Sequence, residues 1–375
     1  MKSVVEHLSD LVRIPSISRL ANRPVIDYVR AALAPAGWRF RELVYRDAGD
    51  IEKVNIIASP PGARLEDSSA DLALVCHTDT VPFSETWTRA TDPFVRDGHL
   101  YGCGACDVKG FLACILTAAL GSASRSIRED LRIVLTADEE VGCIGTSRLM
   151  EAACIQPRRV LIGEPTSLQP ARAGKGYCLA EVTVIGREAH SAHPQQGASA
   201  IYAATELIAE IRKIARDLES EVNDFFSPGY TTINVGTIRG GTAKNIVAGE
   251  CAFLLEWRPL PNQPRDAVAQ QVRVAAARLE REWHGAIRYD IRVTRMQSGF
   301  ETRADAELVR TMETMSGKAA IAIPFGSEAP YFAAVADEVV VFGPGDMRTA
   351  HSERECVPLN ELNAAVDYLQ RLMRA

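Results

Sequence analysis

Four short, almost wholly apolar segments constrain the fold of this chain more than any other feature. They occupy residues 72–76, 131–135, 160–162 and 339–342. A strand buried on both faces need not alternate apolar and polar side chains, so such runs are typical of parallel sheets covered by helices. Polar clusters and segments of helical period follow them. This order predicts an α/β domain with a mixed, mostly parallel sheet sandwiched by helices.

The middle of the chain follows a different pattern. It contains two amphipathic helices, one over residues 201–218 and one that places Val268 to Trp283 on a single apolar face. Strand-like runs flank these helices at residues 179–185, 232–238, 251–257 and 287–293. The order β-α-β-β-α-β is that of a ferredoxin-like sandwich. We therefore predict an inserted α+β lid domain at 172–290, which divides a catalytic domain into 1–171 and 291–375.

Composition excludes several classes of protein. The chain has 375 residues and a net charge of −6, so it lacks the positive field that attracts nucleic acid or anionic membranes. Its longest apolar stretch, 111–120, is about half of the roughly 20 residues that cross a bilayer. Residues 1–13 predict an amphipathic helix and lack the apolar core of a signal peptide. Nine scattered cysteines, an odd number, favour reduced thiols in a cytoplasmic protein.

Imidazole and carboxylate side chains follow the ends of the four apolar runs. In chain order they are His77 with Asp79, then Glu139 with Glu140, then Glu164, and finally His351. Three consecutive carboxylates at 138–140 would otherwise be typical of a solvated loop. Parallel strands deliver their carboxyl ends to one edge of the sheet, where open α/β sheets bind ligands. We therefore expect these side chains to meet at one edge.

Asp107 completes a set large enough for two metal ions that share one carboxylate. Mixed imidazole and carboxylate ligands favour Zn²⁺, with Co²⁺ or Mn²⁺ chemically possible, whereas all-oxygen sets favour Mg²⁺ or Ca²⁺. A dinucleotide site is disfavoured, because Gly102 and Gly104 are followed by Asp107 instead of a third glycine. Cys103 and Cys106 form a single Cys-x-x-Cys, for which a turn is preferred over a redox or metal site.

Taken in order, these motifs resemble the M20 family of di-zinc amidohydrolases and, within it, the bacterial acetylornithine deacetylases. The resemblance extends through nearly the whole chain. Its most specific block is Gly-Glu-Pro-Thr-Ser-Leu-Gln-Pro at 163–170. The other blocks include 77–82, 100–111, 136–142, 186–194, 240–245, 258–261, 326–329 and 343–351.

The resemblance implies a di-metal centre with two zinc ions, or cobalt as an alternative. Asp107 would bridge the two ions. One site would be completed by His77 and Glu164, and the other by Glu140 and His351. The ligand positions are intact, although Cys103 and Cys106 stand where relatives usually carry other residues.

The resemblance also implies roles around the metals. Asp79 would orient His77, Glu139 would be the general base, and His190 would hold the amide oxygen, often across a dimer interface. Asn245 and Arg258 match positions that hold the carboxylate end of the substrate. Further site-lining positions match at Gly326, Ser327 and Glu328, with Ser327 in place of the usual threonine.

The function implied is metal-dependent hydrolysis of the linear amide of a small N-acyl amino acid. The preferred substrate is N2-acetyl-L-ornithine, which would give L-ornithine and acetate for arginine biosynthesis, with the chain as a homodimer through its lid. A succinyl-diaminopimelate desuccinylase, an acetylcitrulline deacetylase and a broad aminoacylase remain alternatives. A non-catalytic scaffold would be expected to lose Glu139 or a ligand, and a thiol redox protein would depend on Cys106.

Overall fold

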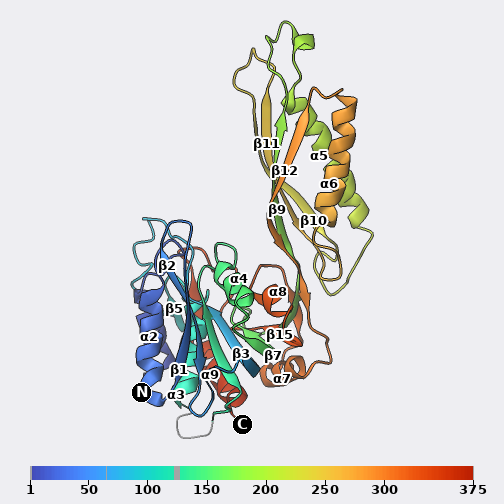
Figure 1. The fold of residues 1–375 in the computed structure, drawn as a ribbon. Helices are drawn as coiled ribbons and strands as arrows, with labels where there is room; N and C mark the ends of the chain where they lie inside the picture. The colour runs from blue at the N-terminus through green and yellow to red at the C-terminus, as the bar shows by residue number, and fades with distance from the viewer. Residues whose placement is uncertain (1, 65, 122–126, 375) are drawn as a thin grey trace. The chain divides into compact units, whose positions relative to one another are not determined.

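The computed structural model describes residues 2–64, 66–121 and 127–374, which divide into two compact units (Figure 1). Unit 1 consists of Met1–Arg172, Glu301–Ile321 and Ser327–Ala375. Unit 2 consists of Ala173–Phe300 and Ala322–Gly326. The first division lies next to the expected boundary at 171, but the second lies beyond the expected 290. Strand β12 (Arg288–Gln297) causes this difference, since it continues past 290 while paired with β9 (Tyr177–Ile185).

Unit 1 contains most of the helices and strands. Its helices are α1 (Val4–Arg13), α2 (Arg23–Leu33), η1 (Ala34–Ala36), α3 (Lys109–Gly121), α4 (Ile144–Glu151), α7 (Glu307–Ser316), α8 (Ala329–Phe332) and α9 (Leu359–Leu372). Its strands are β1 (Arg39–Arg46), β2 (Glu52–Ser59), β3 (Ser69–His77), β4 (Phe94–Arg96), β5 (His99–Tyr101), β6 (Leu131–Thr136), β7 (Gln156–Ile162), β15 (Glu338–Val341) and β16 (Cys356–Pro358). Three short strands span the points where the chain passes between the units: β8 (Ala171–Gly174), β13 (Phe300–Glu301) and β14 (Ile321–Ile323).

The large sheet is mixed, with a parallel centre. Its strand order is β1-β2-β6-β3-β7-β15-β8-β13, with β14 paired to β8. β3 runs parallel to β6 and β7, and β7 runs parallel to β15, whereas β2 is antiparallel to β6. The four apolar runs of the sequence are therefore the four adjacent parallel strands. A small sheet, β16-β5-β4, lies outside this one.

Helices cover both faces of the large sheet, as β2 shows most directly. Alternate residues of a strand point to opposite faces. Val54 and Ile56 belong to the core cluster that includes α1, α2, α3 and α9. Between them, Asn55 donates a hydrogen bond to the carbonyl oxygen of Gly145 in α4 (2.8 Å). The predicted α/β class, with a mostly parallel sheet between helices, is confirmed.

Local sequence explains two helices of this core. Ser3 and Glu6 form a capping box at the start of α1, in which each side chain satisfies a backbone amide of the other. α3 contains the longest apolar run of the chain and is buried on all sides from Lys109 to Leu116. A helix that is apolar all round belongs in the interior. No helix in the described ranges is long and apolar enough to cross a membrane.

Unit 2 has the β-α-β-β-α-β order expected from the sequence. Its elements are β9, η2 (Pro194–Gln196), α5 (Ala200–Leu218), β10 (Thr232–Gly240), β11 (Glu250–Arg258), α6 (Ala267–Glu282) and β12. The sheet order is β10-β11-β9-β12, and every neighbouring pair is antiparallel. Figure 1 shows α5 and α6 together along one face of this sheet. The ferredoxin-like arrangement predicted for this segment is therefore present.

Burial along the two central strands of unit 2, β9 and β11, alternates strictly. Cys178, Ala180, Val182 and Val184 of β9 are buried in the cluster formed with α5 and α6. The residues between them are only partly buried. A sheet covered on one face has this period of two, because successive side chains point to opposite sides.

Candidate metal centre

The parallel strands bring the predicted ligands to one edge of unit 1. His77 is the last residue of β3, and its register partner Thr136 is the last residue of β6. Glu139 and Glu140 follow β6 within a few residues. Val75 of β3 pairs with Ile162, the last residue of β7, which places Glu164 just beyond this same edge. Strands that are far apart in the sequence therefore end at the same edge of the sheet.

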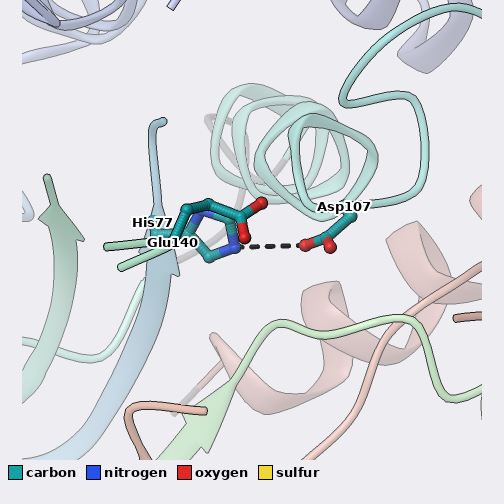
Figure 2. Close-up of side chains that lie close together, drawn as sticks. All are labelled: His77, Asp107 and Glu140. Atoms are coloured by element: carbon teal, nitrogen blue, oxygen red, sulfur yellow. Dashed lines mark hydrogen bonds and ion pairs between the residues drawn. The ribbon is translucent and has the colours of Figure 1, made fainter. Parts of the chain in front are cut away.

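Asp107 lies between two histidines. Its Oδ1 is 3.2 Å from Nε2 of His77, and its Oδ2 is 3.0 Å from Nε2 of His351. Nε2 of His351 is also 3.3 Å from Oε1 of Glu140. Figure 2 shows the side chains of His77, Asp107 and Glu140 close together. One ligand atom of each lies within 4.8 Å of the others. The two oxygens of Asp107 thus face different imidazoles, as a carboxylate shared by two ions requires.

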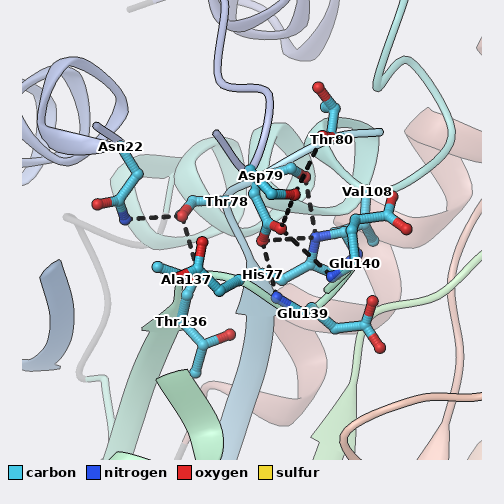
Figure 3. Close-up of polar contacts among 12 residues, drawn as sticks. Asn22, His77, Thr78, Asp79, Thr80, Val108, Thr136, Ala137, Glu139 and Glu140 are labelled. Carbon is cyan, nitrogen blue, oxygen red and sulfur yellow. Dashed lines mark hydrogen bonds and ion pairs between the residues drawn. The ribbon is translucent and has the colours of Figure 1, made fainter. Parts of the chain in front are cut away.

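Asp79 fixes the orientation of His77 and of the acidic loop, residues 138–140. The backbone carbonyl oxygen of Asp79 lies 3.0 Å from Nδ1 of His77, and a carbonyl only accepts hydrogen bonds. Nδ1 therefore donates to this carbonyl oxygen, and Nε2 faces Oδ1 of Asp107 at 3.2 Å. The Asp79 carboxylate accepts from the backbone amides of Glu139 (3.1 Å) and Glu140 (3.3 Å), as Figure 3 shows. The hydroxyl of Ser18 donates to the same carboxylate (2.7 Å).

Burial disfavours negative charge on this group of acids. Burial, together with the charge of Asp107, raises the pKa of Glu164 well above its usual value. Burial raises the pKa of Glu139 to about 8 against the lowering effect of His77, and the charges of Glu140 and Glu328 add to the rise. Hydrogen bonds to Asp107 and Glu140 raise the pKa of His351 to about 10. The cluster therefore favours positive charge among its carboxylates.

The side-chain atoms of the cluster that could bind a metal suit divalent cations. Oε1 of Glu140 is buried and accepts no hydrogen bond from the described residues, although His351 lies close to it. Buried carboxylates without donors are costly unless a cation pairs with them. Two imidazoles and several carboxylates are borderline ligands that suit zinc and neighbouring transition metals. Asp107, His77, Glu140, Glu164 and His351 are therefore the residues that would hold such ions.

Glu355 is a part of the centre that the sequence did not reveal. Its side chain is 1% exposed, and Oε1 accepts from the backbone amides of Cys106 and Asp107, both at 3.1 Å. It thereby fixes the loop that presents Asp107. No local pattern marks Glu355, because its partners lie 249 and 248 residues away in the chain. The only sequence feature that could have indicated Glu355 is its position as an acidic residue shortly after His351.

Cys103 and Cys106 lie in the turns that precede Asp107. Both are buried, at 3% and 1% exposure, and all nine cysteines of the chain are free thiols. Burial raises the pKa of Cys103 to about 12 and that of Cys106 well above its usual value. The thiolate is the reactive form, so these positions disfavour redox chemistry. The geometry agrees with the structural turn preferred from the sequence.

Ser327 and Glu328, two of the predicted site-lining residues, lie in the interior of unit 1. Glu328 is fully buried, and its Oε1 accepts from the hydroxyls of Thr136 (2.6 Å) and Thr146. Ser327 is 2% exposed and accepts from the amide of Ala329 (3.2 Å). Oε1 of Glu328 thus links the two ends of segment 136–146, whereas Oε2 is buried with no hydrogen bond from the described residues. Gly326 belongs to unit 2.

The remaining predicted residues lie in unit 2. His190 is exposed and pairs through a backbone bridge with Ile246, next to Asn245, whose carbonyl oxygen accepts from the amide of Ser191 (3.0 Å). Arg258 ends β11, where its guanidinium bonds Glu256 (2.8 Å) and the carbonyl oxygen of Pro324 (3.1 Å). His190 and Asn245 are thus neighbours within unit 2.

Fold and cluster together define the class: an α/β protein with a candidate divalent-metal centre at the carboxyl edge of its sheet. The sequence matches peptidase family M20/M25/M40 over residues 73–375. It is 45% identical to an acetylornithine deacetylase of Myxococcus xanthus over 95% of this chain and 92% of that protein. It is 33% identical to an acetylornithine deacetylase of Salmonella arizonae, over 94% and 92%.

Solved structures agree in fold. The aminopeptidase PepT of Bacillus cereus matches with a TM-score of 0.79 and 21% identity, over 99% of this chain and 97% of that one. The Bacillus subtilis YXEP protein, described as a dinuclear metal binding peptidase, matches with a TM-score of 0.69 and 15% identity, over 99% and 96%. The chain belongs to peptidase family M20/M25/M40. The predicted resemblance, and the predicted class of hydrolase acting on amide bonds, are confirmed.

Proposed function

We propose that the chain hydrolyses N2-acetyl-L-ornithine to L-ornithine and acetate. The 45% identity to a named acetylornithine deacetylase, extending over 95% of the chain, carries this proposal. The site supports it, because an imidazole and carboxylate cluster beside a buried acid suits hydrolysis of an unactivated amide. A succinyl-diaminopimelate desuccinylase, an acetylcitrulline deacetylase and a broad aminoacylase are the competing outcomes of the test.

We assign the centre to two divalent ions, with zinc preferred over cobalt. Asp107 would bridge them, since its two oxygens face different histidines. His77 and Glu164 would complete one site, and Glu140 and His351 the other. Such ions supply Lewis acidity, which polarises an amide carbonyl and lowers the pKa of water.

Glu139 would act as the general base. It follows β6 at the rim of the cluster, and its backbone amide is fixed by Asp79 (3.1 Å). Its carboxylate would take a proton from the attacking water and then deliver that proton to the leaving amine. A base works best when its pKa is near the working pH, and burial raises the pKa of Glu139 towards this range.

Unit 2 would recognise the substrate and join two copies of the chain. His190 would hold the amide oxygen, and Asn245 with Arg258 would hold the α-carboxylate, for which a planar guanidinium is well suited. Edge strand β10 carries Ile238 at 50% exposure and offers unpaired backbone groups to a second copy. Nine free thiols favour a reducing cytoplasm.

A panel of substrates tests the proposal. Acetyl-ornithine, acetyl-citrulline, acetyl-methionine and succinyl-diaminopimelate would be compared by kcat/KM, with bound metal measured by elemental analysis. The highest kcat/KM is expected for acetyl-ornithine, with two ions per chain. A higher value for succinyl-diaminopimelate or acetyl-citrulline would replace the proposed substrate. Full activity after complete metal removal would overturn the mechanism.

A further inference from the structure

Lys53 is a buried cation that the proposed mechanism does not use. It lies in β2, and its side chain is 1% exposed. Its ammonium donates to Oδ1 of Asp138 (2.8 Å), to the carbonyl oxygen of Leu20 (2.9 Å) and to that of Ser18. An ammonium has three protons, and all three have acceptors here. Lys53 therefore joins two distant loops at one fixed point.

Asp138 is the partner of Lys53 and comes directly before Glu139. It is also 1% exposed, and its Oδ2 accepts from the hydroxyl of Tyr45 (2.8 Å). Its φ of 58° lies in the left-handed region, which few residues other than glycine adopt readily. Both carboxylate oxygens hold the residue in this conformation. The backbone direction at Asp138 decides where the next two side chains point.

Both loops tied by Lys53 lead to the centre. Ser18, whose carbonyl oxygen accepts from Lys53, donates its hydroxyl to Asp79 (2.7 Å). Asp79 in turn accepts from the amides of Glu139 and Glu140. The acidic loop is thus anchored twice, through Asp79 and through Asp138. In the described parts of the chain, no hydrogen bond or ion pair joins Lys53 or Asp138 directly to a predicted metal ligand.

We infer that Lys53 and Asp138 are a positioning pair that sets the directions of Glu139 and Glu140. This inference rests on the proposed function, in which Glu139 is the base and Glu140 a ligand. A small misplacement of a reacting group lowers the rate strongly, by about 100-fold for roughly 1 Å. Loss of the pair should therefore lower kcat and weaken metal binding, while substrate binding through unit 2 is unchanged.

Asp138→Asn tests the pair, because it keeps the shape of the side chain and removes the charge that faces Lys53. At saturating metal, kcat should fall about 100-fold with KM within about twofold of the wild type. The metal dissociation constant should rise about tenfold. Tyr45→Phe removes one hydroxyl donor from Asp138 and should lower kcat in the same direction by about threefold to tenfold.

Arg159→Met is the matched control. Arg159 is 12% exposed, lies on β7 five residues before Glu164, and pairs with Asp71 and Glu307 of unit 1. Its loss should lower the melting temperature while kcat and metal affinity stay at wild-type values. The comparison separates a general loss of stability from a loss of positioning.

The outcomes are distinguishable. If Asp138→Asn lowers the melting temperature but keeps the kcat and the metal affinity of the wild type, the pair only stabilises the fold and the inference is wrong. If the wild type hydrolyses none of the acyl amino acids, the proposed function fails, and the metal affinities still decide the inference. If Asp138→Asn does not fold, Tyr45→Phe tests the inference instead. Wild-type kcat and metal affinity in Tyr45→Phe would then show that Lys53 and Asp138 are not a positioning pair.

Discussion

At the residue scale, the centre depends on which acid has which partner. Asp107 faces two imidazoles, whereas Glu355 accepts two backbone amides and Glu328 accepts two threonine hydroxyls. The carboxylate of Glu139 accepts from the thiol of Cys143 (3.3 Å), and burial raises its pKa to about 8. A carboxylate oxygen that accepts hydrogen bonds braces the structure, while one that lacks donors is available to a metal or a proton.

Glu139→Gln should lower kcat by about 100- to 10,000-fold, because an amide cannot take the proton of water. Bound metal should stay at the wild-type level, since Glu139 is not among the assigned ligands. Release of ornithine and elemental analysis measure the two quantities. Glu151→Gln, an exposed acid on α4, is the control and should behave as wild type. A wild-type kcat in Glu139→Gln would show that Glu139 is not the general base.

Glu355→Ala should raise the metal dissociation constant by about 10- to 100-fold, the usual effect of losing a residue that orients a ligand. The reason is that the amides of Cys106 and Asp107 would lose their common acceptor. Competition with a chelator measures the constant. Glu353→Ala, an exposed neighbour, should leave it unchanged. Equal constants for the two variants would show that Glu355 does not hold the Asp107 loop.

At the element scale, the end of β7 and helix α3 pack too closely for any side chain at Gly163. A Cβ built at Gly163 would lie 2.1 Å from Cδ1 of Phe111. Phe111 is fully buried at the start of the apolar run of α3. Glycine at 163 therefore permits the contact that brings Glu164 beside the other acids.

Gly163→Ala should lower the free energy of unfolding by about 1–3 kcal/mol, the usual cost of overpacking a core. Urea unfolding measures this change. Adding Phe111→Leu to Gly163→Ala should recover part of the loss, because the smaller side chain makes room for the new methyl group. If the two substitutions acted additively, the close contact would not be the cause.

Across the whole molecule, Asp71 holds together segments of unit 1 that are distant in sequence. It accepts from Arg128, Arg158 and Arg159, and the last two also reach Glu307 of α7. Burial acts to raise the pKa of Asp71, but hydrogen bonds from Arg159 and Arg158 and the charges of the arginines lower it to about 2. The charged form of Asp71 is therefore favoured in the folded state.

Asp71→Asn should cost on the order of 2 kcal/mol at pH 7, since one pKa unit corresponds to about 1.4 kcal/mol. The folded pKa lies below the unfolded value, so this stability is present above about pH 4 and is lost towards pH 2. The difference between wild type and variant should therefore shrink as pH falls through this window. Urea unfolding at several pH values measures it. Asp97→Asn, at an 87% exposed side chain, should cost little at any pH.

Much of unit 1 and its predicted ligands could be anticipated from the sequence. The four apolar runs are the parallel strands, because strands buried on both faces need continuous apolar side chains. β1 and β2 were not anticipated. β1 alternates Arg39 and Arg41 with less polar residues at a half-exposed edge, and β2 hides Lys53 and Asn55 in an otherwise apolar run. From the sequence alone a lysine is expected at the surface, because its burial requires acceptors that only the folded structure reveals.

The amino-acid order was sufficient for the strand ends and for the imidazole and carboxylate side chains that follow them, because hydrophobic pattern and chain direction are local properties. It was not sufficient to separate Glu328 and Glu355, which brace loops, from the acids that face the imidazoles. Glu355 meets Asp107 across 248 residues, and Lys53 meets Asp138 across 85. Such pairings arise only when the folded core brings distant loops together and withdraws them from water, which makes each buried charge require its partner.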